Sequence, residues 1–74
     1  MTVDGESFGV WSLRLRNDAG LNQVELSRLM GFNQSHISKI ERDEKTVTAD
    51  YAIAFARAMN IDRGVALAKA GLDD

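Results

Sequence analysis

The sequence contains no cysteine, no proline and only one histidine. Without cysteine, the chain can form neither a disulfide framework nor a thiolate-ligated zinc or iron–sulfur site, and one histidine cannot build a metal site by itself. We therefore expect no metal and no cofactor, and no residue pattern indicates a small-molecule ligand. Because proline is missing and the six glycines are scattered, no segment has the composition of a flexible linker.

Long apolar runs are also missing. The longest near-apolar run, residues 51–59, is about half the length that crosses a bilayer, and it contains Arg57. The opening stretch, MTVDGESFGV, lacks the basic start and the apolar segment of a secretory signal. We expect a protein that has no membrane span and stays in the cytoplasm.

The motifs of common enzyme classes are absent as well. There is no glycine-rich phosphate-binding loop, and no pair of carboxylates stands out as a general acid and base. The single histidine, His36, is two residues from Ser38, and a helix would point these two side chains away from each other. We expect a binding protein and not an enzyme.

What the chain does contain is the composition of one small folded domain. Its 74 residues are 45% hydrophobic and 27% charged, and a second domain would be too small to support a core. We expect residues 1–74 to form a single domain. The net charge is −2, which argues mildly against nucleic-acid binding. Residues 14–42, however, carry five basic and three acidic residues, so one face can be positive.

Helix start and stop signals predict an all-α fold. Asn22 is a good N-cap with Glu25 in capping-box position, and Gly31 ends that helix shortly before the next N-cap, Asn33. A Gly-containing turn of this length between two short helices is typical of a helix-turn-helix unit. No β-branched run alternates with polar residues as a strand would. We expect five helices, over residues 6–18, 23–30, 34–41, 48–59 and 63–70.

Apolar residues at helical spacing predict the buried side of the first two helices. These residues are Phe8, Trp11, Leu15 and Ala19 in the first helix, and Leu26, Leu29 and Met30 in the second. The helix over 48–59 is apolar nearly all round, which predicts a position in the middle of the domain.

On a helix over residues 34–42, polar and apolar side chains fall on opposite sides. Ile37 and Ile40 share one side, and the other side carries only uncharged polar or basic residues: Gln34, Ser35, Ser38, Lys39 and Arg42. An ordinary solvated face in so acidic a chain would more often pair Glu with Lys at four-residue spacing. Gln, Ser and Lys can hydrogen-bond base edges, and Arg or Lys can neutralise phosphate. This helix is therefore predicted to recognise DNA.

Together these positions resemble the helix-turn-helix domains of the phage lambda-type repressor and Cro family, also called XRE-type regulators. The residues that carry the resemblance are Gln23, Leu26–Ser27, Gly31, Gln34–Ser35, Ile37–Ser38 and Ile40–Glu41. The resemblance extends over residues 8–70 and implies a five-helix, lambda-repressor-like DNA-binding domain. It also implies a sequence-specific transcriptional regulator of phage or bacterial type, acting as a repressor on double-stranded DNA.

The resemblance implies roles for individual side chains. Four residues of the third helix would contact base edges in the major groove: Gln34, Ser35, Ser38 and Lys39. Four others would contact backbone phosphates: Asn22, Gln23, Arg42 and Lys45. In this family an Arg late in the first helix forms a structural salt bridge with the Glu that ends the third, here Arg16 with Glu41. The alternative is that Arg16 is a free basic residue.

The chain departs from the family pattern at Ser27, where the family commonly has Ala, in the loop over residues 42–47, and in the first helix. The family has Gly two residues after the Glu and Pro before the fourth helix, and this sequence has Asp43 and Val47 there. Residues 42–47 are thus where the resemblance gives least guidance. The first helix also has Ser12 and Leu13 in the reverse of the expected apolar–polar order.

Three questions stay open on the sequence alone. The domain could keep its shape as a protein-interaction module, such as an antitoxin, an anti-repressor or an assembly factor, which the negative charge favours. His36 could be a partly exposed helix residue or a contact to phosphate or base. The fifth helix could form a homodimer contact, which we expect, or pack within the monomer. Its apolar residues are Val65, Leu67, Ala68 and Leu72.

Overall fold

Five helices and the turns between them make up the part of the chain that the computed structural model describes, residues 5–72. The helices are α1 (Phe8–Asp18), α2 (Gln23–Met30), α3 (Gln34–Glu41), α4 (Ala49–Met59) and α5 (Arg63–Lys69). Each begins and ends within two residues of the bounds expected from the sequence, and no strand occurs among the described residues. The fold is all-α, as predicted.

A polar side chain caps the N-terminus of each of these helices. The caps accept a hydrogen bond from a backbone N–H of the first turn, and they are Ser7, Asn22, Asn33, Thr48 and Asp62. Asn22 and Glu25 form the complete capping box that the sequence predicts. Gly31 and Asn60 follow α2 and α4 in the left-handed conformation, with φ 77° and 58°. Helices this short gain little from intrinsic propensity, so caps and core packing define their ends.

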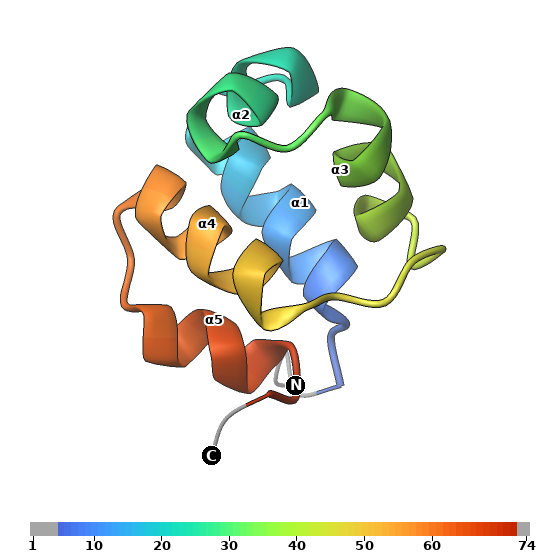
Figure 1. Ribbon diagram of the computed structural model, residues 1–74, viewed down its shortest axis with the longest axis vertical. Coiled ribbons are helices and arrows are strands. Elements are labelled where there is room, and N and C mark those ends of the chain that lie inside the picture. Colours follow the sequence, from blue (N-terminus) through green and yellow to red (C-terminus); the bar gives the residue numbers. More distant parts are fainter. Residues whose placement is uncertain (1–4, 73–74) are drawn as a thin grey trace.

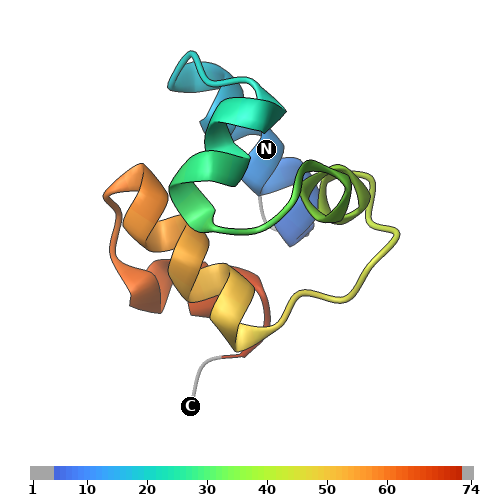
Figure 2. The same cartoon turned by 45° about the horizontal axis from the view of Figure 1, so that its top comes forward.

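The helix-turn-helix unit, α2 and α3, lies at one end of the molecule, and α5 lies at the other (Figure 1). α4 lies between them and packs against both α2 and α5, while α1 packs against α3. Figure 2 views α3 nearly along its axis, at the edge of the molecule. One side of α3 therefore meets the core, and the opposite side is open.

The core is built around aromatic rings of α1 and α4. Phe8, Trp11 and Phe55 form a cluster whose ring centroids are 5.3, 5.7 and 5.6 Å apart. The remaining buried apolar side chains come from α2, α3, α4 and α5: Leu26, Met30, Ile37, Ile40, Tyr51, Ala52, Ala56 and Ala66. α4 thus holds the central position that its all-round apolar sequence predicts.

Two of the expected core positions are wrong. Leu29 is 57% exposed, because α2 lies at the edge of the fold and buries only Leu26 and Met30. Ala19 is also exposed, since it lies beyond the last turn of α1 as the C-cap. α1 instead buries Ser12, whose hydroxyl donates to a backbone carbonyl of the same helix at 3.1 Å. That hydrogen bond satisfies the hydroxyl inside the core.

The first turn of α1 lies close against the end of α3. A Cβ atom at Gly9 would collide with the Ile40 carbonyl oxygen and the Asp43 carboxylate. The hydroxyl of Ser7, which caps α1, also donates to Asp43 Oδ2 at 3.0 Å. Asp43 has φ 59°, the left-handed conformation that Gly adopts most readily. Asp43 therefore meets the backbone requirement of the Gly in the family pattern and ties the loop to α1.

Neither a membrane span nor a metal cluster occurs within residues 5–72. No helix in this range is both long enough and apolar enough to cross a bilayer. Over the same range, no three His, Asp or Glu residues gather in a way that could hold a metal ion.

Gly9→Ala should lower the free energy of unfolding by about 1–3 kcal/mol, because the added methyl group must push α1 away from the end of α3. Gly64→Ala in α5 is the matched control, since a Cβ there would meet only the Asp62 side chain at 3.5 Å or more. That variant should be as stable as the unchanged protein or more stable. Urea unfolding followed by circular dichroism measures both. Equal stability of the two variants would contradict the close approach.

Candidate nucleic-acid interface

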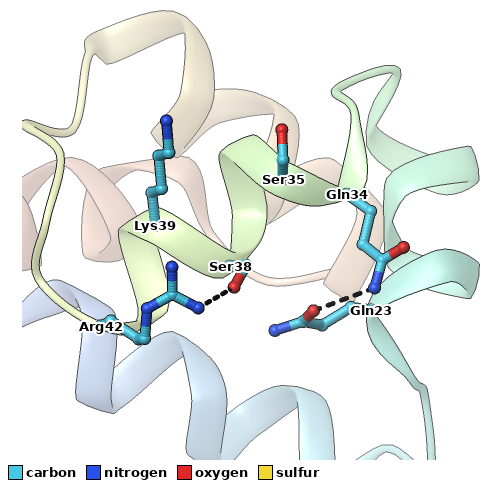
Figure 3. Close-up of a pocket in the computed structure, with 6 residues that line it drawn as sticks. All are labelled: Gln23, Gln34, Ser35, Ser38, Lys39 and Arg42. Carbon is cyan, nitrogen blue, oxygen red and sulfur yellow. Dashed lines mark hydrogen bonds between the residues drawn. The ribbon is translucent and has the colours of Figure 1, made fainter.

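The open side of α3 forms a shallow depression together with one residue of α2. The depression has a volume of about 280 Å³, and Figure 3 shows the side chains that line it. They are Gln23, Gln34, Ser35, Ser38, Lys39 and Arg42. On the opposite side of α3, Ile37 and Ile40 are fully buried. The apolar side chains of α3 thus anchor the helix to the core. No carboxylate lines the depression on its exposed side.

The lining side chains point in two directions from α3. Ser35 and Lys39 extend to one side, whereas Gln34 and Arg42 lie on the side nearer to Gln23 (Figure 3). The hydroxyl of Ser35 donates to Asn33 Oδ1 at 3.0 Å, the same oxygen that caps α3. The Ser38 hydroxyl accepts a hydrogen bond from the Arg42 guanidinium. Amide, hydroxyl, ammonium and guanidinium groups therefore stand side by side, a mixture of hydrogen-bond donors and acceptors with positive charge.

A buried ion pair joins α1 to the end of α3 beneath this surface. Arg16 Nε donates to Glu41 Oε2 at 2.7 Å, and Nη2 donates to Oε1 at 3.0 Å. Arg16 Nη1 also donates to the Leu21 carbonyl oxygen at 2.8 Å. Arg16 is 8% exposed and Glu41 is 7% exposed. These are the two residues that the family resemblance pairs, and their planar, two-pronged contact fixes the orientation of both side chains.

Hydrogen bonds connect this ion pair to the surface. Gln23 Nε2 donates to Glu41 Oε1 at 2.8 Å, and Gln34 Nε2 donates to Gln23 Oε1 at 3.3 Å. A chain of contacts thus runs from Arg16 in α1 to Gln34, the first residue of α3. Gln23 was expected at a phosphate, and the structure places its side-chain amide between Glu41 and Gln34. No pattern in the sequence indicates this bridging contact, because it depends on the crossing of α2 and α3.

The Arg42 side chain is already paired in the free protein. Its Nε and Nη2 donate to the two carboxylate oxygens of Glu44 at 3.1 and 3.0 Å. The hydrogen bond lowers the pKa of Glu44 and raises the pKa of Arg42. Both side chains are more than half exposed, so water screens the pair and it contributes little to stability. An anionic ligand can therefore replace Glu44 at low cost.

The two other expected phosphate contacts lie outside the depression. Asn22 Oδ1 accepts from the Glu25 N–H at 2.8 Å, so this oxygen serves as the cap of α2. Lys45 lies in the loop between α3 and α4 and lines a neighbouring hollow with His36 and Lys39. The ring of His36 packs against Phe32 and Tyr51, with centroids 5.1 and 5.2 Å apart. Burial also raises the pKa of Tyr51.

Comparison with known proteins bears on the same part of the chain. A family model described as helix-turn-helix matches residues 13–65. The control protein C.SmaI of Serratia marcescens is 33% identical to this chain over 57 residues, which are 77% of this chain and 68% of that protein. The family match contains all of α2, α3 and α4, and so it contains the whole depression.

Glu41→Gln should lower the free energy of unfolding by about 3–5 kcal/mol, because the buried Arg16 charge would lose its partner. Glu44→Gln is the matched control, since it breaks an Arg–Glu pair of the same geometry on the surface. It should leave the urea midpoint unchanged within the error of the measurement. A Glu41→Gln variant as stable as the control would mean that the buried pair does not hold α1 against α3.

Proposed function

The chain belongs to the helix-turn-helix family of DNA-binding transcription regulators, and we propose that it represses transcription by binding a specific double-stranded operator with α3 in the major groove. One observation carries the proposal: the exposed side of α3 is polar, partly basic and free of carboxylates, although the chain as a whole is acidic. Carboxylates at these positions would repel the phosphate backbone. A relative is named a control protein, which agrees with a regulatory role.

The base contacts in this proposal come from the exposed side of α3. Gln34 can form two hydrogen bonds with an adenine edge, and Lys39 can donate to guanine. Ser35 and Ser38 can donate to or accept from either kind of base. The hydrogen bond from Gln34 to Gln23 orients its amide before DNA arrives, which reduces the entropy lost on binding.

The phosphate contacts surround these base contacts. Asn22 and Gln23 stand at the N-terminus of α2, where the helix dipole favours an anion. Arg42 would exchange its carboxylate partner Glu44 for a phosphate, and Lys45 would bind the backbone from the loop after α3. This set fixes the register of α3 on the duplex and carries no sequence information itself.

The protein acts in this proposal as a homodimer without enzymatic activity, in the cytoplasm where the DNA is. α5 and the residues just after it support the dimer, because Val65 in α5 is 47% exposed and Leu72, three residues beyond the helix, is 39% exposed; Ala68 in α5 is exposed as well. Leu67 instead packs against the core, so only part of the apolar surface of α5 is free. In a two-fold dimer, the two α3 helices would enter major grooves about 34–36 Å apart.

Selection of bound duplexes from a random DNA library at near-physiological salt tests the function. We expect an enriched near-palindrome with half-sites about 10 bp apart. An asymmetric single site would keep DNA recognition and remove the symmetric dimer. No enrichment would contradict the proposal and favour a protein-interaction module with a helix-turn-helix shape.

Two substitutions separate base contacts from phosphate contacts on the selected operator. Gln34→Ala should cost about 1–3 kcal/mol of binding free energy and relax the preference at one base pair. Arg42→Ala should weaken binding to all sequences equally. It should also make the decrease of affinity with salt concentration less steep, by the contribution of about one phosphate contact. Arg57→Ala on α4 serves as the control for loss of an exposed arginine. If Gln34→Ala kept the same base preference, α3 would not be the reading helix.

Val65→Asp should shift the protein from dimer to monomer in sedimentation equilibrium, because a carboxylate would enter an apolar contact between two copies of α5. Val24→Asp is the matched control, since Val24 is 39% exposed on α2, at the other end of the molecule. The control should keep the mass of the unchanged protein. A monomeric unchanged protein at micromolar concentration would rule out the α5 dimer.

A further inference from the structure

A second hollow lies beside the first, between the start of α3 and the loop that follows its end. It has a volume of about 170 Å³, and it is lined by Asn33, Ser35, His36, Lys39 and Lys45. Ser35 and Lys39 line both hollows, so the second one continues the open side of α3. Two lysines and the only histidine of the chain therefore converge at the edge of the proposed DNA interface.

The imidazole of His36 is held in place by aromatic rings. Its ring centroid is 5.1 Å from that of Phe32, edge to face, and 5.2 Å from that of Tyr51, at 32° between the planes. The hydrogen bond that His36 makes among residues 5–72 is from its backbone N–H, and its ring nitrogens make none there. The ring is only partly buried, so it stays accessible from the hollow that it lines. An oriented imidazole whose nitrogens make no hydrogen bond within the described residues is available to a ligand.

The charges that face His36 are positive. Lys39 is one turn further along α3, and Lys45 faces it from the loop. Neither lysine forms an ion pair among residues 5–72. From α4, the group packed on the imidazole is Tyr51, whose raised pKa keeps its phenol neutral. The carboxylate of Glu44, in the same loop as Lys45, is held by Arg42.

This environment disfavours the protonated imidazole while the hollow is empty of ligand. Partial burial lowers the pKa of His36, and the charges of Lys45 and Lys39 lower it further. A bound phosphate would reverse the balance, because its negative charge would offset part of the repulsion from the lysines and its oxygens would accept a hydrogen bond from an imidazolium. The phosphate complex would then hold a proton that the free protein lacks.

We propose that this hollow binds one phosphate of the DNA backbone and that His36 is a phosphate ligand, taking up a proton as the complex forms. The inference rests on the proposed function and adds a pH dependence to it. Because the complex binds more protons than the free protein, affinity for the operator rises as the pH falls. As the pH falls, the affinity begins to rise near the pKa of His36 in the complex. It stops rising below the pKa of His36 in the free protein.

Fluorescence anisotropy on the selected operator tests this linkage between about pH 8 and about pH 5.5, a range that brackets the ordinary histidine pKa. At constant ionic strength, the affinity of the unchanged protein should rise about tenfold for each unit by which DNA binding raises the His36 pKa. His36→Gln should lose this rise. His36→Phe should lose it too, and it keeps an aromatic ring against Phe32 and Tyr51, so the two variants together separate titration from packing.

Nuclear magnetic resonance gives a direct readout, because a single histidine makes the imidazole signal unambiguous. The pKa of His36 should be higher in the complex than in the free protein. In the free protein, Lys45→Met should raise it, since one repelling charge is removed. An unchanged His36 pKa in that variant would overturn the arrangement of charges proposed for the hollow.

The outcomes distinguish this inference from the function on which it rests. If no duplex binds at any pH, the proposed function fails. If the unchanged protein binds its operator equally well at all pH values, the function stands and the role of His36 is refuted. The same refutation follows if both His36 variants keep the pH dependence of the unchanged protein, because another group then takes up the proton.

Discussion

The buried contact between Arg16 and Glu41 is the interaction on which the rest of the molecule depends. It joins α1 to the end of α3, and the same carboxylate receives the Gln23 amide from α2. Three helices therefore meet at one buried carboxylate. Removal of two charges from water is costly, and only well-made hydrogen bonds offset that cost. Here they are well made, since no buried side-chain nitrogen or oxygen within residues 5–72 lacks a partner. Through Glu41, a hydrogen bond therefore holds the start of α2 to the end of α3.

Charge is distributed unevenly over the surface of the molecule. Positive side chains on the open side of α3 and in the next loop either have no ion pair within the described residues, as with Lys39 and Lys45, or have a replaceable one, as with Arg42. Elsewhere the chain carries more acids than bases, which gives its negative total. The net charge of a protein of this size therefore says little about which ligands it can bind, because a ligand interacts mainly with the charges within about 10 Å of its own.

Local signals in the sequence were enough to predict the helices, because each one is bounded by a capping residue or by a residue in the left-handed conformation. The burial of Leu29 was predicted wrongly. The spacing of apolar residues shows which side of a helix faces the core, but it does not show how much of that side the other helices cover. Contacts between elements were the hardest to foresee. The collision that a Cβ would cause at Gly9, and the Gln23 amide between α2 and α3, depend on how helices cross, which no local pattern encodes. The family resemblance named Arg16 and Glu41 as partners, and composition alone left Arg16 among several basic residues.

The hydroxyl of Ser7 links parts of the chain that are 36 residues apart. It accepts the Val10 N–H as the cap of α1 and donates to Asp43 in the loop after α3. The first turn of α1 and this loop therefore share one hydrogen-bonded atom, so fraying at one releases the other, and their amide protons should exchange with solvent as a single cooperative unit. A peptide cut out as the two helices α2 and α3 would lack this link, the ion pair to α1 and the core beneath α3. The smallest part of the chain that keeps the shape of the open side of α3 thus begins before α1, well outside the helix-turn-helix unit itself.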